Sequence, residues 1–428
     1  MGNKRDRHDP AEHCARHHGQ RRGRYRSALS AYQGSPVSEP SIAVLIGLAV
    51  GPYGLGWLDL ALWGDPYMVL EQAARLTLAI GLMGVALRLK REAIKALIRP
   101  IALLLTLGML GMWLISSMLA GWLLGLSLWT ALLLGAILTP TDPVVASSIV
   151  TGKFAKQHLP LRLRDTLSAE SGSNDGLAYV FVMLPILMIS HTPDQAVSRW
   201  LLESVLTGVI GASLLGALIG FFAAKLLAFA ERHDLVAGTS LLGYSVAFSL
   251  LTLGLAKLLH TDGVLAVFVA GLLFNMFSDR QEEHEEENTQ EAVAKLFTLP
   301  MFVIFGIALP LSEWTSLGWP LFWLALLVLL LRRLPVLMML APTWRQQLNK
   351  HDAAFLGWFG PIGIAAIYYA ALAHSHLHDP QFWHAASALI FASIMLHGVS
   401  AAPLTRLHAR RPGPTPPRTA DLDAQREE

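Results

Sequence analysis

The sequence predicts an all-α protein that crosses a membrane about twelve times, and three observations support this fold class. The 428 residues are 53% hydrophobic and only 15% charged, whereas roughly 25% charged residues are usual in soluble domains. The mean hydropathy is +0.46. The charges gather in short stretches that separate long apolar runs. A transmembrane β-barrel would show short segments of alternating hydrophobicity instead, so the pattern favours spanning helices.

Twelve apolar segments have about the length of 17–25 residues that a spanning helix needs. The first is interrupted by Gly51 and Pro52, which predicts a short or bent helix. We expect one transmembrane domain over residues 37–405, between a disordered basic tail (1–36) and a disordered proline-rich tail (406–428). The segments lie at 41–58, 67–89, 99–124, 127–151, 163–190, 204–230, 238–259, 262–278, 295–312, 318–341, 351–373 and 381–404.

The distribution of basic residues tests this count, because lysine and arginine are enriched in cytosolic loops. With residues 1–36 in the cytosol, every second loop should be basic. The loops in question hold, in order, Arg88, Lys90, Arg91, Lys95 and Arg99; Lys153, Lys156, Arg162 and Arg164; Arg345 and Lys350; and Arg406, Arg410 and Arg411. The opposite loops hold only scattered cations. We therefore predict a multi-pass protein of the inner cell membrane with both termini in the cytosol.

Two of the segments are broken in the same way. The fourth contains LTPTDP (138–143), and the eleventh contains FGPIG (359–363). Proline cannot continue a regular helix. Interrupted segments in corresponding halves are typical of transporters built from inverted repeats, whose site lies where the broken helices cross. The sequence therefore predicts two crossed broken helices around a buried site.

The fifth segment carries polar groups at a depth where a charge costs roughly 2.5–3.5 kcal/mol on insertion scales. At 100° per residue, Glu170 and Asn174 share one helix face, and Ser171 and Asp175 share a neighbouring face. One face can hold a structural partner while the other meets a ligand. Intramembrane carboxylates usually mark pathways for ions or protons, so this segment is the candidate site.

Asp175 is the central candidate. Burial favours the neutral form of a carboxyl group, so this side chain can hold either a proton or a small cation. Carboxylate and hydroxyl oxygens are suitable ligands for a hard cation, and we expect Ser171 and Thr141 to supply hydroxyls. We expect Asp142 to cap the unwound backbone beside the ion. The alternative is that Asp175 serves packing alone.

A buried Glu170 needs a cationic partner, and the candidates are the adjacent Arg332 and Arg333 in the tenth segment. We predict that Arg332 forms the pair. The alternative is that both arginines end the span and snorkel to the surface.

Other polar residues within the apolar segments have less specific interpretations. Glu71 and Arg75 are one helical turn apart, and they either pair with each other or line an entrance. Asp262 is predicted to be a helix cap.

These motifs together resemble the electroneutral, NhaP-like branch of the sodium/proton antiporters, within the cation:proton antiporter superfamily. The resemblance covers about residues 36–405. It is carried by Thr141-Asp142-Pro143, Glu170-Ser171, Asn174-Asp175-Gly176, Arg332-x-Leu-x-Val, GVLAVFVAGLLF (263–274) and WFGPIGIAAI (358–367).

The resemblance implies a dimerisation part and a core part related by inverted repeats, and a homodimer in the lipid bilayer. It implies electroneutral exchange of one monovalent cation, Na⁺ or K⁺, for one proton at Asp175, with no cofactor and no nucleic-acid partner. Asn174, Asp142, Thr141 and neighbouring Thr139 would tie the broken helices together, and Glu170 would pair with Arg332.

Two departures from the family pattern give further expectations. A polar tail precedes PVSEP (36–40), where relatives carry an apolar helix, so we expect the family's first helix to be missing. Many relatives carry a basic residue where Ile362 stands, so another group must supply that charge or the charge is absent.

Two rival functions stay open at this point. One is a potassium efflux carrier or channel-like cation transporter. The other is an intramembrane serine protease using Ser171 or Ser173 with His397, although the cluster of Glu170 and Asp175 is not needed there.

Overall fold

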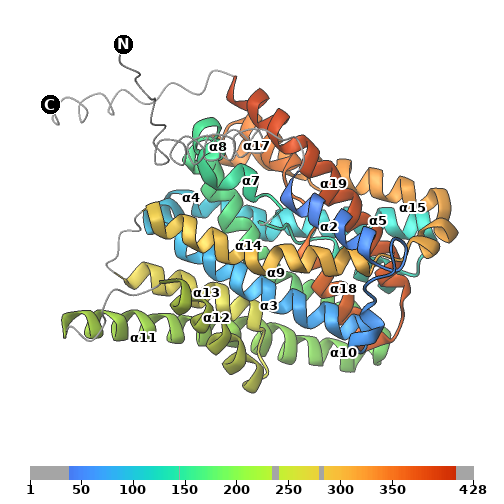
Figure 1. The fold of residues 1–428 in the computed structure, drawn as a ribbon, viewed down its shortest axis with the longest axis horizontal. Coiled ribbons are helices and arrows are strands. Elements are labelled where there is room, and N and C mark those ends of the chain that lie inside the picture. The colour runs from blue at the N-terminus through green and yellow to red at the C-terminus, as the bar shows by residue number, and fades with distance from the viewer. Residues whose placement is uncertain (1–37, 144, 234–240, 279–283, 411–428) are drawn as a thin grey trace, which may run out of the picture.

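The computed structural model describes residues 38–143, 145–233, 241–278 and 284–410 (Figure 1). The basic tail predicted at 1–36 and residues 411–428 of the second tail lie outside these ranges. The last helix continues to Ala409. Residues 406–409, which were expected to belong to the tail, are therefore helical.

All regular secondary structure in the described ranges is helical, as the sequence predicted. Each of the twelve predicted segments contains a helix. The helices are α2 (Glu39–Val50), α3 (Pro66–Arg88), α4 (Arg91–Leu103), α5 (Met109–Leu124), α6 (Leu128–Ile137), α7 (Ser147–Val150), α8 (Gly152–His158), α9 (Leu161–Ser190), α10 (Pro193–Arg199), α11 (Ala212–Arg232), α12 (Leu241–Leu258), α13 (Gly263–Phe277), α14 (His284–Ile307), α15 (Leu311–Leu331), α16 (Leu334–Leu340), α17 (Lys350–Trp358), α18 (Ile364–Leu377) and α19 (Gln381–Ala409).

Helix starts follow local capping chemistry. Ser38 accepts a hydrogen bond from the Ser41 N–H at the start of α2, and Pro40 lies in the first turn, where a missing N–H costs nothing. Asp262 caps α13 by accepting from the Leu265 N–H at 2.6 Å, which confirms its predicted role as a helix cap. Helix α2 ends at Val50, directly before the Gly51–Pro52 interruption, so the first segment is indeed short.

Six continuous helical stretches are long and apolar enough to cross a membrane, and shorter apolar helices accompany them. The longest, Pro193–Ala230, runs through α10, the π-helical segment η3 (Trp200–Gly211) and α11. Its outer side is apolar, with exposed Leu214, Leu218, Phe222 and Phe229. A soluble protein rarely exposes so continuous an apolar stripe. The stripe therefore faces lipid.

The opposite side of α11 packs closely against α13. A Cβ atom added to Gly216 or to Gly220 would overlap the carbonyl oxygens of Ala266 and Ala270, respectively. Small residues four apart let the backbones of two membrane helices come together. The long helix is therefore held directly against α13.

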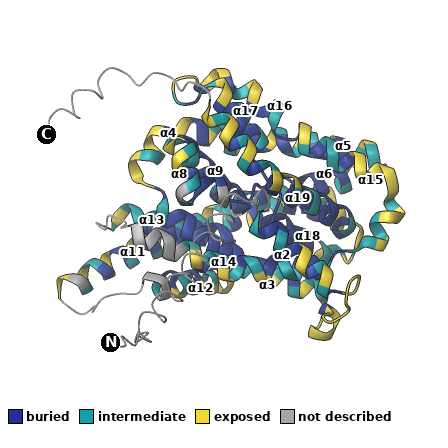
Figure 2. Ribbon diagram, turned by 45° about the horizontal axis from the view of Figure 1, so that its top comes forward, coloured by how far each residue is buried: buried dark blue, intermediate teal, exposed yellow. Residues whose placement is uncertain are grey.

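Helix α9 lies in the interior of the bundle, where it contacts α3, α4, α6, α13 and α18 (Figure 1). Buried residues line most of its length (Figure 2). Two broken helices flank it. Regular helix stops at Ile137 and resumes at Ser147 in the first, and it stops at Trp358 and resumes at Ile364 in the second. Both breaks occur where the proline-containing motifs predicted them.

Candidate functional site

The two breaks meet at Asp142. Its backbone N–H donates to the Pro361 carbonyl at 2.9 Å. Its carboxylate accepts from the Ile364 N–H at 2.5 Å and from the Val145 N–H at 3.3 Å. One aspartate therefore caps the start of α18 and orders the backbone of its own break. The predicted crossing of the broken helices is confirmed.

Other elements satisfy the remaining polar groups of the second break. Arg332 donates to the Gly360 carbonyl, and the Ile362 N–H donates to the Ser393 hydroxyl at 2.8 Å. The Trp358 carbonyl lies 3.0 Å from Nε2 of His397. Buried backbone groups are costly when they lack partners. The break is therefore a structured element held by several helices.

Gly363 lies between Pro361 and Ile364, the two residues that bind Asp142, and the crossing needs a glycine at this position. A Cβ atom added to Gly363 would overlap the Asp142 carboxylate. We expect Gly363→Ala to lower the free energy of unfolding by about 1–3 kcal/mol, because the added methyl group displaces the cap. The measurement is thermal unfolding in detergent. Gly254→Ala in α12 is the matched control, since an added Cβ there meets no atom within 4 Å. An unchanged melting temperature for Gly363→Ala would contradict this account.

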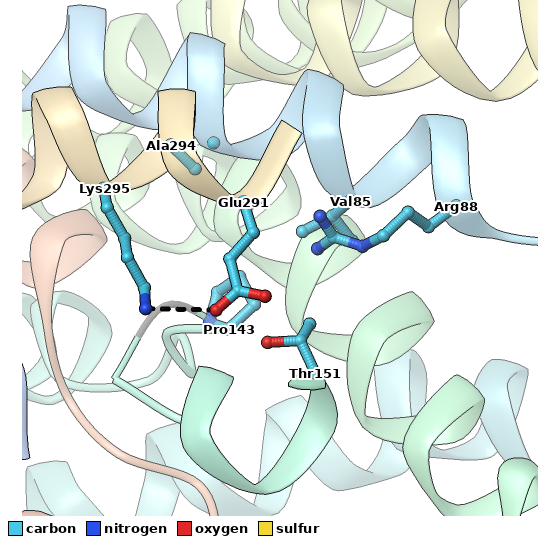
Figure 3. A pocket seen from close by; sticks show the side chains of 8 residues that line it. Val85, Arg88, Pro143, Thr151, Glu291, Ala294 and Lys295 are labelled. Atoms are coloured by element: carbon cyan, nitrogen blue, oxygen red, sulfur yellow. Dashed lines mark ion pairs between the residues drawn. The ribbon is translucent and has the colours of Figure 1, made fainter. Parts of the chain in front are cut away.

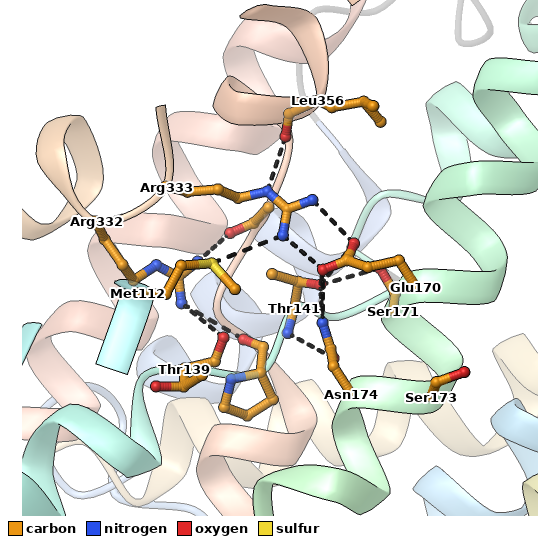
Figure 4. A network of polar contacts seen from close by, with 12 residues as sticks. Met112, Thr139, Thr141, Glu170, Ser171, Ser173, Asn174, Arg332, Arg333 and Leu356 are labelled. Carbon is orange, nitrogen blue, oxygen red and sulfur yellow. Dashed lines mark hydrogen bonds and ion pairs between the residues drawn. The ribbon is translucent and has the colours of Figure 1, made fainter. Parts of the chain in front are cut away.

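Helix α9 is joined to the first break by a buried polar network (Figure 4). The amide of Asn174 accepts from the Thr141 N–H at 3.1 Å and donates to the Thr141 hydroxyl and to Glu170 at 2.8 Å each. The hydroxyls of Thr141 and Ser171 are 3.1 Å apart. Four of the predicted residues thus lie in one network, and Asn174 ties the two elements together.

The partner of Glu170 is Arg333, and the prediction of Arg332 was wrong. Two guanidinium nitrogens of Arg333 donate to the two carboxylate oxygens at 2.7 and 2.9 Å, a bidentate geometry that is strong. Arg332 instead donates to carbonyls of both breaks, including those of Leu138 and Gly360. Both side chains lie outside regular helix, between Leu331 and Leu334, and the sequence does not give their directions there.

Both arginines are 2% exposed, so they do not snorkel to the surface. They occupy the short interruption between α15 and α16. Arg333 also donates from Nε to the Leu356 carbonyl at 2.8 Å. The two guanidinium groups therefore connect α9, the two breaks and the end of α17.

Asp175 is the exception in this cluster. Its side chain is fully buried, at 0% exposure. Among the described residues, neither oxygen of its carboxylate has a hydrogen-bond partner. The Tyr369 hydroxyl donates to the backbone carbonyl of Asp175 at 2.5 Å and leaves the carboxylate open. An orphaned buried carboxylate is costly and fits a site for a proton or a cation.

The charges of the cluster do not cancel. Asp175 interacts electrostatically with Asp142 and with Glu170, and the two guanidinium groups interact with Glu170. When all three carboxylates are ionised and both guanidinium groups are protonated, the cluster carries one net negative charge. A single added positive charge neutralises it.

Several other predicted groups have different contacts. The Thr139 hydroxyl donates back to the Gly135 carbonyl in the last turns of α6, and the Thr139 backbone carbonyl faces Arg332. Arg75 donates to Gln72, while Glu71 accepts from the Ser375 hydroxyl at 3.1 Å. The Ser173 hydroxyl donates to the Ala169 carbonyl, and in Figure 4 its side chain points away from the network.

A cavity of about 30 Å³ lies next to the first break (Figure 3). Pro143, which follows Asp142, lines it together with residues of α3 and α14. At its edge Lys295 pairs with Glu291 at 3.1 Å and with Glu39 at 3.0 Å. Charged residues of α14 therefore line the same cavity as Pro143 of the first break.

Comparisons with known proteins agree with this geometry. Residues 27–407 match the family model described as the transmembrane sodium/hydrogen exchanger. The Na⁺/H⁺ antiporter 2 of Zygosaccharomyces rouxii is 33% identical over 352 residues, which are 80% of this chain and 43% of that protein. The Na⁺/H⁺ antiporter of Saccharomyces cerevisiae is 31% identical over 402 residues, which are 86% of this chain and 41% of that protein. This chain thus spans about two-fifths of the length of these yeast relatives.

Bacterial and archaeal proteins are also similar. The K⁺/H⁺ antiporter NhaP of Alkalimonas amylolytica is 26% identical over 385 residues, which are 88% of this chain and 63% of that protein. The solved structure of the sodium proton antiporter MjNhaP1 from Methanocaldococcus jannaschii superimposes with a TM-score of 0.66 at 20% identity, covering 86% of this chain and 91% of that one. The fold is therefore shared. With the family model matching most of its length, the chain belongs to the transmembrane sodium/hydrogen exchanger family.

Proposed function

We propose that this protein exchanges one monovalent cation, Na⁺ or K⁺, for one proton at Asp175. The observation that carries the proposal is the buried carboxylate whose two oxygens lack hydrogen-bond partners among the described residues. A proton and a monovalent cation each supply the one positive charge that the cluster lacks. Occupancy by one therefore excludes the other, which makes exchange electroneutral. The names of the relatives, Na⁺/H⁺ and K⁺/H⁺ antiporters, support both candidate cations.

The remaining site residues have distinct roles in this proposal. The hydroxyls of Ser171 and Thr141 are candidate ligands beside Asp175, since hard cations bind carboxylate and hydroxyl oxygens. Asn174 holds α9 against the first break, and Asp142 holds the two breaks together. Glu170 is neutralised by Arg333, so Asp175 remains the carboxylate that exchanges its charge.

Transport requires that Asp175 be reached from each side in turn. We propose that α9 and the two broken helices move together against α3, α13 and α14. The cavity beside Pro143 lies between these two groups of elements and is the candidate inner entrance. We further propose an inner-membrane location, cytosolic termini and a homodimer, and a transport cycle without an enzymatic step.

The test is cation-driven proton movement in proteoliposomes, with Na⁺, K⁺ and Li⁺ in turn and with the membrane potential free or clamped. We expect exchange with at least one cation at a rate that does not depend on the potential. A rate driven by the potential would favour an electrogenic carrier. Conductance far above carrier rates would favour the channel-like alternative.

A further inference from the structure

Helix α19 carries a line of polar side chains at helical spacing, formed by Ser393, His397, Ser400 and His408. At 100° per residue these four positions fall within an arc of about 80°. Polar groups in a spanning helix are retained where they have partners. All four of these face the second broken helix.

Each member of this polar line contacts α17 or the break that follows it. His408 lies 3.4 Å from the Asp352 carboxylate near the start of α17. The Trp358 indole donates to the Ser400 hydroxyl at 3.0 Å. Towards the break, His397 contacts the Trp358 carbonyl, and Ser393 accepts from the Ile362 N–H. Helix α19 therefore holds the first half of the broken helix at both ends.

The hydrogen bonds at the break form a closed chain when His397 is neutral. Its Nε2 faces the Trp358 carbonyl at 3.0 Å, which accepts but cannot donate, so Nε2 must carry the hydrogen. Its Nδ1 lies 3.1 Å from the Ser393 hydroxyl and 2.9 Å from the Ser393 carbonyl. In the neutral ring Nδ1 carries no hydrogen, so it makes no hydrogen bond to the carbonyl and can only accept from the hydroxyl. The hydroxyl donates to Nδ1 and accepts from the Ile362 N–H. Two side chains thus satisfy one carbonyl and one N–H that the break leaves free.

We propose that Ser393 and His397 are positioning residues for the ion site. The Ile362 N–H that donates to Ser393 belongs to the same peptide unit as the Pro361 carbonyl that accepts from Asp142, and the Ile364 N–H that donates to Asp142 follows two residues later. Fixing the break therefore fixes the Asp142 cap, which in turn neighbours Asp175. The expected effect of Ser393 and His397 variants on transport rests on the proposed exchange function. Their expected effect on the local stability of the break does not.

The first test measures transport in proteoliposomes. We expect Ser393→Ala to raise the apparent KM for the cation about tenfold, because a buried N–H loses its partner. Ser393→Thr retains the hydroxyl and should stay within about twofold of the wild type. His397→Gln keeps an N–H donor, so it should raise the apparent KM for the cation less than His397→Leu does. His384→Gln makes the same change elsewhere on α19 and is the matched control. Equal losses in Ser393→Thr and Ser393→Ala would overturn the proposal.

The second test does not depend on transport. We expect amide hydrogen exchange in the segment 356–366 to become about tenfold faster in Ser393→Ala, while the segment 200–211 remains unchanged. Faster exchange in a protein whose wild type moves no ions would support the positioning of the break and reject the proposed function. Wild-type amide exchange and wild-type KM in a folded Ser393→Ala would reject the positioning role. If Ser393→Ala does not fold, the contrast between His397→Gln and His397→Leu decides, and equal effects of these two variants would reject the positioning role.

Discussion

Replacing Asp175 by asparagine is expected to abolish cation–proton exchange, by at least about 10³-fold. The amide matches the carboxylate in shape but neither binds and releases a proton nor carries the charge that attracts a cation. Because both carboxylate oxygens lack hydrogen-bond partners among the described residues, the substitution should break no hydrogen bond. We therefore expect the fold to be retained, with a melting temperature at or above that of the wild type.

Ligand-dependent stability separates loss of binding from loss of movement. A cation at ten times its Kd should stabilise the wild type by about 1.4 kcal/mol, and the same addition should leave Asp175→Asn unchanged. The matched control is Asp379→Asn in the loop after α18, where the side chain only accepts from the Gln381 N–H. If Asp175→Asn still exchanged ions or were still stabilised by the cation, the assigned site would be wrong.

Removing the Arg333 side chain is expected to cost about 3–5 kcal/mol of folding stability, because it leaves Glu170 charged, fully buried and unpaired. Arg333→Met is the suitable variant, since methionine fills much of the same volume. The double variant Glu170→Gln with Arg333→Met should recover most of the loss. The measurement is thermal or denaturant unfolding of the purified protein in detergent, which needs no transport assay.

Arg332→Met is the comparison that distinguishes the two arginines. Without the Arg332 guanidinium group, backbone carbonyls of the two breaks lack a donor, which lowers folding stability by about 1–3 kcal/mol. In a double-mutant cycle, Glu170 should couple strongly to Arg333 and weakly to Arg332. The opposite ranking would restore the partner that the sequence suggested.

The spans and breaks could be predicted because their signals are local. Apolar length marks each helix, and Pro140, Pro143 and Pro361 mark where a helix cannot continue. The arrangement of Asn174 and Glu170 on one face also followed from helical periodicity, and the structure confirms it. These predictions needed no knowledge of how the helices pack.

The choice between Arg332 and Arg333 could not be made in this way. Helix α15 ends at Leu331 and α16 begins at Leu334, so both residues lie where the helical period does not continue. Their directions depend on packing against the breaks. The contacts of Ser393 and His397 with the second break could not be predicted for a related reason. Their partners are backbone groups of the break, and the sequence does not show which side chains a backbone group will meet.

The long helix that runs from Pro193 to Ala230 has a mechanical consequence. At about 1.5 Å per residue its 38 residues extend over roughly 57 Å, whereas the hydrocarbon layer is about 30 Å thick. The helix is therefore longer than the layer is thick, so its polar first turns, with Asp194 and Arg199, extend beyond the layer and its axis leans away from the bilayer normal. Thinning or thickening the bilayer changes that inclination. Gly216 and Gly220 allow the long helix to pack closely against α13, and α13 contacts α9. A change in bilayer thickness is therefore transmitted through α13 to the position of α9, the helix that carries Asp175.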